Sequence, residues 1–158
     1  MNLLHNRRAS FVIVNDAPFA TPFGSVNTAI RRLTSTVESS QGPDISYVTA
    51  QIANEGSAFL INTAGLYYMS YVDSMSSAGA SSVFGISRNS NQLTTAVNLI
   101  TATHRLAIAT TSAVATAPVI CFAIARLAVG DIIRPHGDAN ENGDTEYGVR
   151  FEIGKISP

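Results

Sequence analysis

The segment from Asp138 to Asp144 has the residue types and spacing of an oxygen-ligand loop for calcium. Carboxylate and amide side chains alternate before Gly143, as in calcium loops that begin Asp-x-Asn-x-Asn-Gly. The bidentate glutamate that such loops carry six residues after the glycine is replaced by Val149, and flanking helical patterns are missing. An acidic hairpin loop is therefore the favoured interpretation, with calcium binding as the alternative. If calcium binds, the expected ligands are Asp138, Asn140, Asn142 and Asp144.

The other residues with catalytic potential are one cysteine and three histidines. Cys121 lies in a run that is apolar on both faces, from Pro118 to Ile124, where a thiol is expected to be buried and inert. His5, His104 and His136 are far apart in the sequence and form no closely spaced metal-binding pair. The sequence contains no GxSxG, phosphate-loop or HExxH motif. We therefore expect no enzymatic activity and no cofactor apart from the calcium alternative.

Charged residues make up only 13% of the 158 residues, about half of the roughly 25% that is usual in globular proteins. The hydrophobic fraction of 46% is ordinary, which excludes an intrinsically disordered chain. A formal net charge of -1 argues against general nucleic-acid binding. No apolar run reaches the roughly 18 residues needed to cross a bilayer, and the apolar stretch after Arg7-Arg8 is too short for a signal peptide. We expect neither a membrane nor a nucleic-acid partner.

The pattern along the chain changes near residue 45. Residues 1–45 contain three prolines and two arginine pairs, and we predict an extended N-terminal arm there. Apolar residues at helical spacing predict a short helix over residues 25–37. Over residues 46–158, turn residues separate short apolar runs, which predicts an all-β antiparallel sandwich or jelly roll. The expected strands are Ser46–Ile52, Ala58–Asn62, Leu66–Asp73, Val83–Arg88, Leu93–Thr101, His104–Ser112, Val119–Leu127, Asp131–His136 and Tyr147–Ile156.

Several short motifs resemble those of the complement component 1q and tumour-necrosis-factor-like (TNF-like) jelly-roll family. Phe59–Tyr71 follows the pattern F-x5-G-x-Y-x-F-x-[FY], with Met69 where an aromatic residue is usual. Leu127–Ile132 is similar to the family's L-x-x-G-D-x turn, and Asn89 and Phe151–Gly154 resemble two further family segments. The front half of the family signature is absent. The resemblance covers about residues 46–156 and is greatest to bacterial and phage members, such as the head domain of the collagen-like spore-surface glycoprotein.

This resemblance implies a ten-stranded jelly roll that assembles as a homotrimer, with its flat sheets buried against neighbouring copies. Tyr67 and Tyr71 are then expected to pack near the three-fold axis, the alternative being that they fill the core of one protomer. Low surface charge agrees with assembly, because few charged groups must lose water when the surface is covered.

These observations predict a non-enzymatic structural protein of a bacteriophage particle, namely a trimeric capsid decoration (cement) protein anchored by its N-terminal arm. Its partners would be itself and the major capsid protein. We expect it in the virion, on the capsid surface, after synthesis in the host cytoplasm without a signal peptide. The alternative is the receptor- or glycan-binding head of a phage fibre or of a spore or cell-surface adhesin.

The arm is expected to bind its partner in two ways. Phe11–Val14 would add a strand to a neighbouring sheet edge, and the arginine pairs would meet carboxylates. An arm that folds over its own domain is the alternative. The residues assigned to partner binding are Arg7, Arg8, Phe11, Val12, Ile13, Val14, Arg31 and Arg32.

Overall fold

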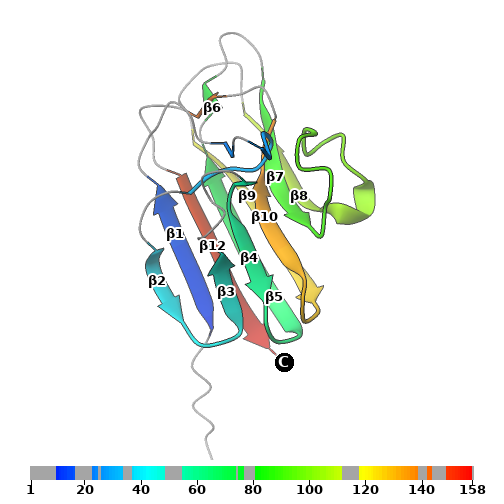
Figure 1. Cartoon of the computed structure of the whole chain (residues 1–158). Helices are drawn as coiled ribbons and strands as arrows, with labels where there is room; N and C mark the ends of the chain where they lie inside the picture. Colours follow the sequence, from blue (N-terminus) through cyan, green and yellow to red (C-terminus); the bar gives the residue numbers. More distant parts are fainter. Residues whose placement is uncertain are drawn as a thin grey trace, which may run out of the picture.

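The structure is a computed structural model, and its core is a sandwich of two five-stranded antiparallel sheets (Figure 1). It describes residues 10–16, 23–24, 26–33, 37–48, 55–73, 75–76, 81–111, 118–138, 142–143 and 149–157. The prediction of an all-β antiparallel jelly-roll sandwich is confirmed.

The first sheet has the strand order β2-β1-β12-β5-β9 and the second has the order β3-β4-β10-β7-β8. The strands of the first sheet are β1 (Phe11–Asp16), β2 (Val37–Gln41), β5 (Gly65–Asp73), β9 (Val119–Leu127) and β12 (Val149–Ser157). Those of the second sheet are β3 (Ile45–Val48), β4 (Ala58–Ile61), β7 (Val83–Arg88), β8 (Arg105–Thr110) and β10 (Ile132–His136). A small two-stranded sheet and a short 3-10 helix complete the described elements: β6 (Met75–Ser76), β11 (Asn142–Gly143) and η1 (Ala102–His104).

The core lies between the two sheets, and buried and outward-facing residues alternate most regularly along β5. Every second residue of β5 is buried, and Tyr67 and Tyr71 have no exposed surface in the single protomer. The ring of Tyr71 meets the ring of Phe84 edge-on, with 5.1 Å between their centroids. The prediction that Tyr67 and Tyr71 pack against other copies is therefore wrong, since both side chains fill the core of their own sandwich.

β1 is an internal strand of the first sheet and does not belong to a separate arm. It pairs with β12 on one side and with β2 on the other, so neither of its edges is open to a neighbouring sheet. Val12 and Val14 point into the core and are buried. The predicted division into an arm over 1–45 and a jelly roll over 46–158 is wrong for β1 and β2, as is strand addition by Phe11–Val14. Both strands belong to the sandwich, because β1 pairs with β12 and β2 pairs with the other edge of β1.

The helix predicted over residues 25–37 does not form in the part of that range that the structure describes. Residues 26–33 make a turn followed by extended backbone that lies beside the end of β10. The backbone N–H of Arg31 donates to the carbonyl of Pro135, and the N–H of Ser57 donates to the carbonyl of Arg31. Ala29, Ile30 and Leu33 are buried because the extended chain joins the end of β10 to Ser57, the residue before β4.

The strand predicted over Leu93–Thr101 is instead a series of turns, which lies over His136 at the end of β10. Val97 and Ile100 are buried, and their spacing of three fits one side of a turn-rich loop better than one face of a strand. The loop is held by hydrogen bonds from the N–H of Ala29 to the carbonyl of Leu93 and from the N–H of Val97 to the carbonyl of Gly137. The loop therefore covers the part of the outer face that contains Ser87 and His136, both of which are buried. Among the described residues, no helix is long and apolar enough to span a membrane.

Candidate functional site: an exposed apolar sheet face

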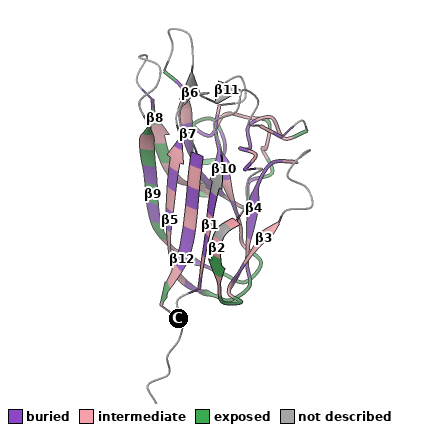
Figure 2. Ribbon diagram, turned by 90° about the vertical axis from the view of Figure 1, so that its left-hand side faces the viewer, coloured by how far each residue is buried: buried purple, intermediate pink, exposed green. Residues whose placement is uncertain are grey.

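Three large apolar side chains lie in line on the outer face of β9, the edge strand of the first sheet. Ile120, Phe122 and Ile124 are 64%, 56% and 57% exposed, respectively. They alternate with Cys121 and Ala123, which are buried against the core (Figure 2). A strand that is apolar on both faces is typical of one that is covered on both faces. Within the protomer, β9 is covered on one face only.

The strand register extends this exposed line into a continuous surface. Ile120 lies opposite Val72 of β5, and Ile124 lies opposite Tyr68 of the same strand. β12 and β1 continue the face beyond β5, as Figure 2 shows. We call this surface the β9 face; it consists of Phe11, Ile13, Leu66, Tyr68, Ser70, Val72, Ile120, Phe122, Ile124, Arg126, Arg150, Glu152 and Gly154.

One polar line crosses the β9 face. The hydroxyl of Tyr68 donates a hydrogen bond of 2.6 Å to Oε1 of Glu152. Nη2 of Arg150 lies 3.6 Å from Oε2 of the same carboxylate. Partial burial, followed by the hydrogen bond to Glu152, raises the pKa of Tyr68 to about 12, so this hydroxyl keeps its proton and acts as a donor at neutral pH. The line is thus a fixed donor–acceptor chain on an otherwise largely apolar surface.

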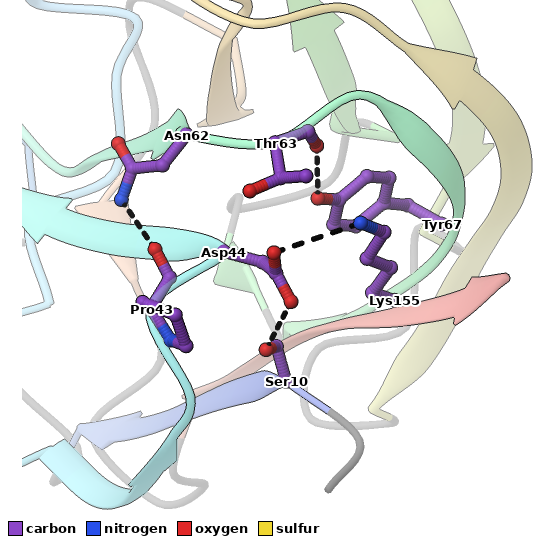
Figure 3. Close-up of polar contacts among 7 residues, drawn as sticks. All are labelled: Ser10, Pro43, Asp44, Asn62, Thr63, Tyr67 and Lys155. Carbon is purple, nitrogen blue, oxygen red and sulfur yellow. Dashed lines mark hydrogen bonds and ion pairs between the residues drawn. The ribbon is translucent and has the colours of Figure 1, made fainter. Parts of the chain in front are cut away.

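A polar cluster ties the strand ends together at the end of the sandwich where β12 finishes (Figure 3). Ser10 donates a hydrogen bond to Oδ2 of Asp44, and Nζ of Lys155 lies 3.6 Å from Oδ1. The hydrogen bonds from Ser10 and Thr63, and then the Lys155 charge, lower the pKa of Asp44. Tyr67 donates to the carbonyl of Thr63 at 2.6 Å, which joins the β4–β5 turn to the same end. Each of these polar groups has a partner within the chain, so the cluster stabilises this end of the sandwich.

The buried ion pair between Arg31 and Asp73 lies at the opposite end of β5. Nη2 of Arg31 is 3.0 Å from Oδ1 of Asp73, and the hydroxyl of Tyr71 donates to Oδ2. The guanidinium lies over the ring of Phe23, 5.7 Å from its centroid, and only 1% of Arg31 is exposed. Arg31 is therefore a core residue, and its predicted partner-binding role is wrong. Arg32 is half-buried, and its predicted role stays a prediction. Arg7 and Arg8 lie outside the described residues.

Two motifs that are distant in the sequence meet at the turn before β10. Asn89 has a positive φ of 53° and donates a 2.6 Å hydrogen bond to Oδ1 of Asp131. Its own side-chain oxygen accepts a hydrogen bond of 2.7 Å from the N–H of Ile132. Asp131 in turn accepts from the N–H of Ala128, and Gly130 has the positive φ that closes the turn. These two resemblances to the TNF-like family therefore share one structural role, which is to lock the β9–β10 turn to the end of β7.

Two residues considered for catalysis have structural environments. Cys121 is buried, as predicted, and burial raises the pKa of its thiol to about 11, which keeps it protonated. His136 is buried beneath the 89–104 loop, with Nδ1 3.0 Å from Oγ of Ser87 and Nε2 2.7 Å from the carbonyl of Thr95. Burial lowers the pKa of His136 to about 4.

The proposed calcium loop lies mostly outside the described residues. Asp138 is half-buried, and Asn142 belongs to β11, where it pairs with Ser76 of β6. Asn140 and Asp144 lie outside the described residues. Within the described ranges, no group of three or more histidine, cysteine, aspartate or glutamate side chains is close enough to hold a metal ion. Calcium binding stays a prediction.

Comparison with known structures identifies the fold. No family model matches the sequence, and no curated protein matches it. The structure is similar to crystal structures of murine APRIL at pH 5.0 and pH 8.0, with TM-scores of 0.57 and 0.58 and sequence identities of 12% and 13%. The similarity covers 94% and 92% of this chain and 100% and 99% of the APRIL chains. The chain therefore has the TNF-like jelly-roll fold, whereas similarity to bacterial or phage members stays a prediction.

The sequence contained a signal for the β9 face that the prediction of partner residues did not use. The run from Pro118 to Ile124 is apolar on both faces, and this pattern was used only to predict that the thiol of Cys121 is buried. In an edge strand that the protomer covers on one face only, the same pattern indicates that the other face is an interaction surface. For β5, the wrong set of alternate residues was assigned to assembly: Tyr67 and Tyr71 point inward, and Tyr68 points outward.

Proposed function

We propose that this chain is a non-enzymatic assembly protein that forms a homotrimer by burying the β9 face against copies of itself. The observation that carries the proposal is the row of Ile120, Phe122 and Ile124, each more than half exposed on the edge strand β9. Exposed apolar surface of this kind marks interaction sites, because covering it releases water at a gain of roughly 25 cal/mol per Å².

The asymmetry between the two sheets supports this location for the interface. The 89–104 loop covers part of the outer face of the second sheet, where Ile108 is the exposed large apolar residue among the described strands at 42%, whereas Ile120, Phe122 and Ile124 on β9 are each more than half exposed. Copies of the chain suit this surface because its partner must also carry few charges, as this sequence does at 13%. The trimeric stoichiometry rests on the implied assembly of the TNF-like family.

We further propose that the trimer serves as a structural subunit of a bacteriophage particle, as a capsid decoration protein in contact with the major capsid protein. Three attachment points per trimer make weak individual contacts act together as one strong contact. Because β1 is an internal strand, attachment uses the surface of the trimer and the residues before Ser10, and it does not use strand addition by Phe11–Val14.

Sedimentation velocity over a range of protein concentrations tests self-assembly. The wild-type chain is expected to sediment as a trimer, and Phe122→Glu as a monomer with an unchanged circular-dichroism spectrum. Leu99→Glu is the matched control, because Leu99 is 71% exposed but lies on the loop over the second sheet. A wild-type monomer at all concentrations, or an unaffected Phe122→Glu trimer, would contradict the proposal.

Quantification of the protein in purified virions tests the particle role. Copies numbering in the tens to hundreds, together with rebinding of the purified trimer to stripped capsids, are expected of a decoration protein. Specific binding to host cells or glycans without binding to capsids would support the receptor-binding head instead.

A further inference from the structure

We infer that the corner of the sandwich where β7, β8 and β9 meet binds the acidic segment 138–146 of another copy. Three arginines lie at this corner, which we call the arginine corner: Arg88, Arg105 and Arg126. Arg105 is the register partner of Ser87, the residue before Arg88. Nη1 of Arg88 lies 3.4 Å from the carbonyl oxygen of Arg126. Strands that are distant in the sequence thus bring three positive charges to one corner.

None of the three arginines forms an ion pair within the described part of the chain. Arg88 and Arg105 each donate to a backbone carbonyl, which holds the side chain but does not neutralise the guanidinium. Other described cations have carboxylates nearby: Arg31 has Asp73, Arg134 has Glu55, Arg150 has Glu152 and Lys155 has Asp44. Asp131, in the adjacent β9–β10 turn, offsets one of the three positive charges and already accepts from two neutral donors. The arginine corner therefore keeps a net positive charge.

The segment 138–146 has the complementary charge. Four of the eleven acidic residues of the chain fall within it, and it contains no lysine or arginine. Complementary charges steer two surfaces toward each other and determine which surfaces meet. A second copy of the chain therefore supplies the carboxylates that the arginine corner lacks. The four are Asp138, Glu141, Asp144 and Glu146.

The acidic segment of the same chain cannot reach this corner. Its strand β11 pairs with β6, directly beyond Asp73 at one end of β5, and Figure 1 shows β6 at the upper end of the sandwich. Arg126 lies opposite Leu66, near the other end of β5. At roughly 3.3 Å per residue, about 23 Å of strand separates Leu66 from Asp73. The short stretches on either side of β11 cannot span that distance and return, so the pairing must be between copies.

This contact is separate from the proposed interface on the β9 face. Arg88 and Arg105 belong to β7 and β8 of the second sheet, outside that face. A single exposed ion pair is too weak to hold two copies together. A trimer repeats each of its surfaces three times, so several pairings between two trimers can act together as one stronger contact.

Sedimentation velocity at two salt concentrations tests the pairing. In about 0.05 M NaCl the wild type is expected to form species larger than the trimer, and in about 0.5 M NaCl these should dissociate, because salt screens charges on exposed surfaces. The trimer itself should persist at the higher salt, since its proposed interface is mainly apolar.

Charge reversal on each side identifies the two surfaces. Each variant alone is expected to weaken the formation of larger species about tenfold or more at low salt, because like charges then meet. Mixing the two variants should restore these species, since each supplies the charge that the other has lost. Both variants leave the β9 face unchanged. The first is Arg88→Glu with Arg105→Glu, and the second is Glu141→Lys with Asp144→Lys and Glu146→Lys.

Glu55→Gln is the control, because it removes a carboxylate beside Arg134, outside both surfaces, and it should leave the species distribution unchanged. Urea unfolding of each variant confirms that its protomer is folded. A wild type with no species larger than the trimer at low salt, or variants that do not associate again on mixing, would overturn the inference and leave the proposed trimer intact. A wild type that is monomeric at high salt but associates at low salt would instead contradict the trimer and support the charge pairing.

Discussion

Tyr68 lies over Gly154 on the neighbouring strand, so closely that a Cβ atom at Gly154 would be 2.3 Å from Cε1 of the tyrosine ring. The two residues are direct partners in the β5–β12 register. Because Gly154 has no side chain, the Tyr68 ring can lie directly against the sheet. In this position the hydroxyl of Tyr68 donates its hydrogen bond to Glu152. This glycine therefore determines the shape of the β9 face without taking part in any polar contact there.

Gly154→Ala is expected to displace the Tyr68 ring and break its hydrogen bond to Glu152. The free energy of unfolding should fall by about 1–3 kcal/mol, the usual cost of forcing an extra carbon into a packed site. Self-association should weaken as well, because the β9 face, which we propose as the contact surface between copies, changes shape. Urea unfolding measures the first effect and sedimentation equilibrium measures the second.

Gly130→Ala provides the comparison for this substitution. Gly130 has a φ of 88° and open space around its Cβ position, so alanine there strains the backbone of the turn by about 1 kcal/mol without touching the β9 face. Equal loss of self-association in both variants would mean that instability alone explains the effect of Gly154→Ala.

Removing one member of the Arg31–Asp73 pair is expected to cost roughly 3–5 kcal/mol of unfolding free energy, because the remaining charge stays buried without its partner. The pair is almost completely buried, with side-chain exposures of 2% and 0%. The double variant Arg31→Met, Asp73→Leu should be less destabilised than the sum of Arg31→Met and Asp73→Leu alone. A double-mutant cycle from chemical denaturation measures this coupling, and strictly additive losses would show that the pair does not act as a unit.

Stability is expected to decrease as the pH falls from about 6.5 toward 4 because of His136. Its folded-state pKa is lowered to about 4 by burial, so the unfolded chain takes up the proton first and acid favours unfolding. The shift from 6.5 corresponds to a loss of roughly 3 kcal/mol across that window. At pH values well above 6.5 the residue is neutral in both states and contributes no pH dependence.

Urea unfolding of the wild type and of His136→Gln at pH 7.5, 6.0 and 4.5 measures this contribution. The variant should be less stable at pH 7.5 but should lose less stability on acidification. The pKa of Asp44 is lowered in the folded state, so the stability that its carboxylate contributes is lost only as the pH falls below the ordinary value of 3.8. Measurements above pH 4 therefore do not include this loss. Parallel curves for the two proteins would rule out His136 as the source.

Asn89→Ala is expected to lower the free energy of unfolding by about 2 kcal/mol, since it removes two side-chain hydrogen bonds and places alanine at a positive φ. Asn89→Gly loses the same hydrogen bonds but tolerates the backbone angle, so its loss should be smaller. Thermal unfolding of both variants gives the difference. An alanine variant as stable as the glycine variant would show that the positive φ carries no cost at this turn.

Much of the fold was predictable because period-two patterns fix which residues face inward. The strand expected over Val119–Leu127 coincides with β9, and that expected over Val83–Arg88 coincides with β7. The local sequence pattern gave the wrong prediction where contacts distant in the sequence determine the backbone conformation or the strand pairing. The segment containing Ile30 and Leu33 has helical spacing, but it is extended because it pairs beside β10. Phe11–Val14 was recognised as a strand, but nothing local indicated that its partner was β12, which begins at residue 149.

The site was harder to predict than the fold because alternation alone leaves two choices of face. Tyr67 and Tyr68 are adjacent tyrosines, and only the position of β5 within the sheet decides which one is buried. The assignment of Arg31 to partner binding failed for a related reason, since its buried partner Asp73 is far along the chain.

The pairing of β1 with β12 has a mechanical consequence for any particle that carries this protein. The N–H of Lys155 donates to the carbonyl of Ser10, so the two ends of the described fold leave the sandwich side by side. Force that pulls these ends apart would open the β1–β12 ladder one rung at a time, as a zipper opens, instead of shearing all its rungs together. If the protein carries tension in a particle, we therefore expect the force to act on the broad faces of the sandwich and not on the two ends of the described fold.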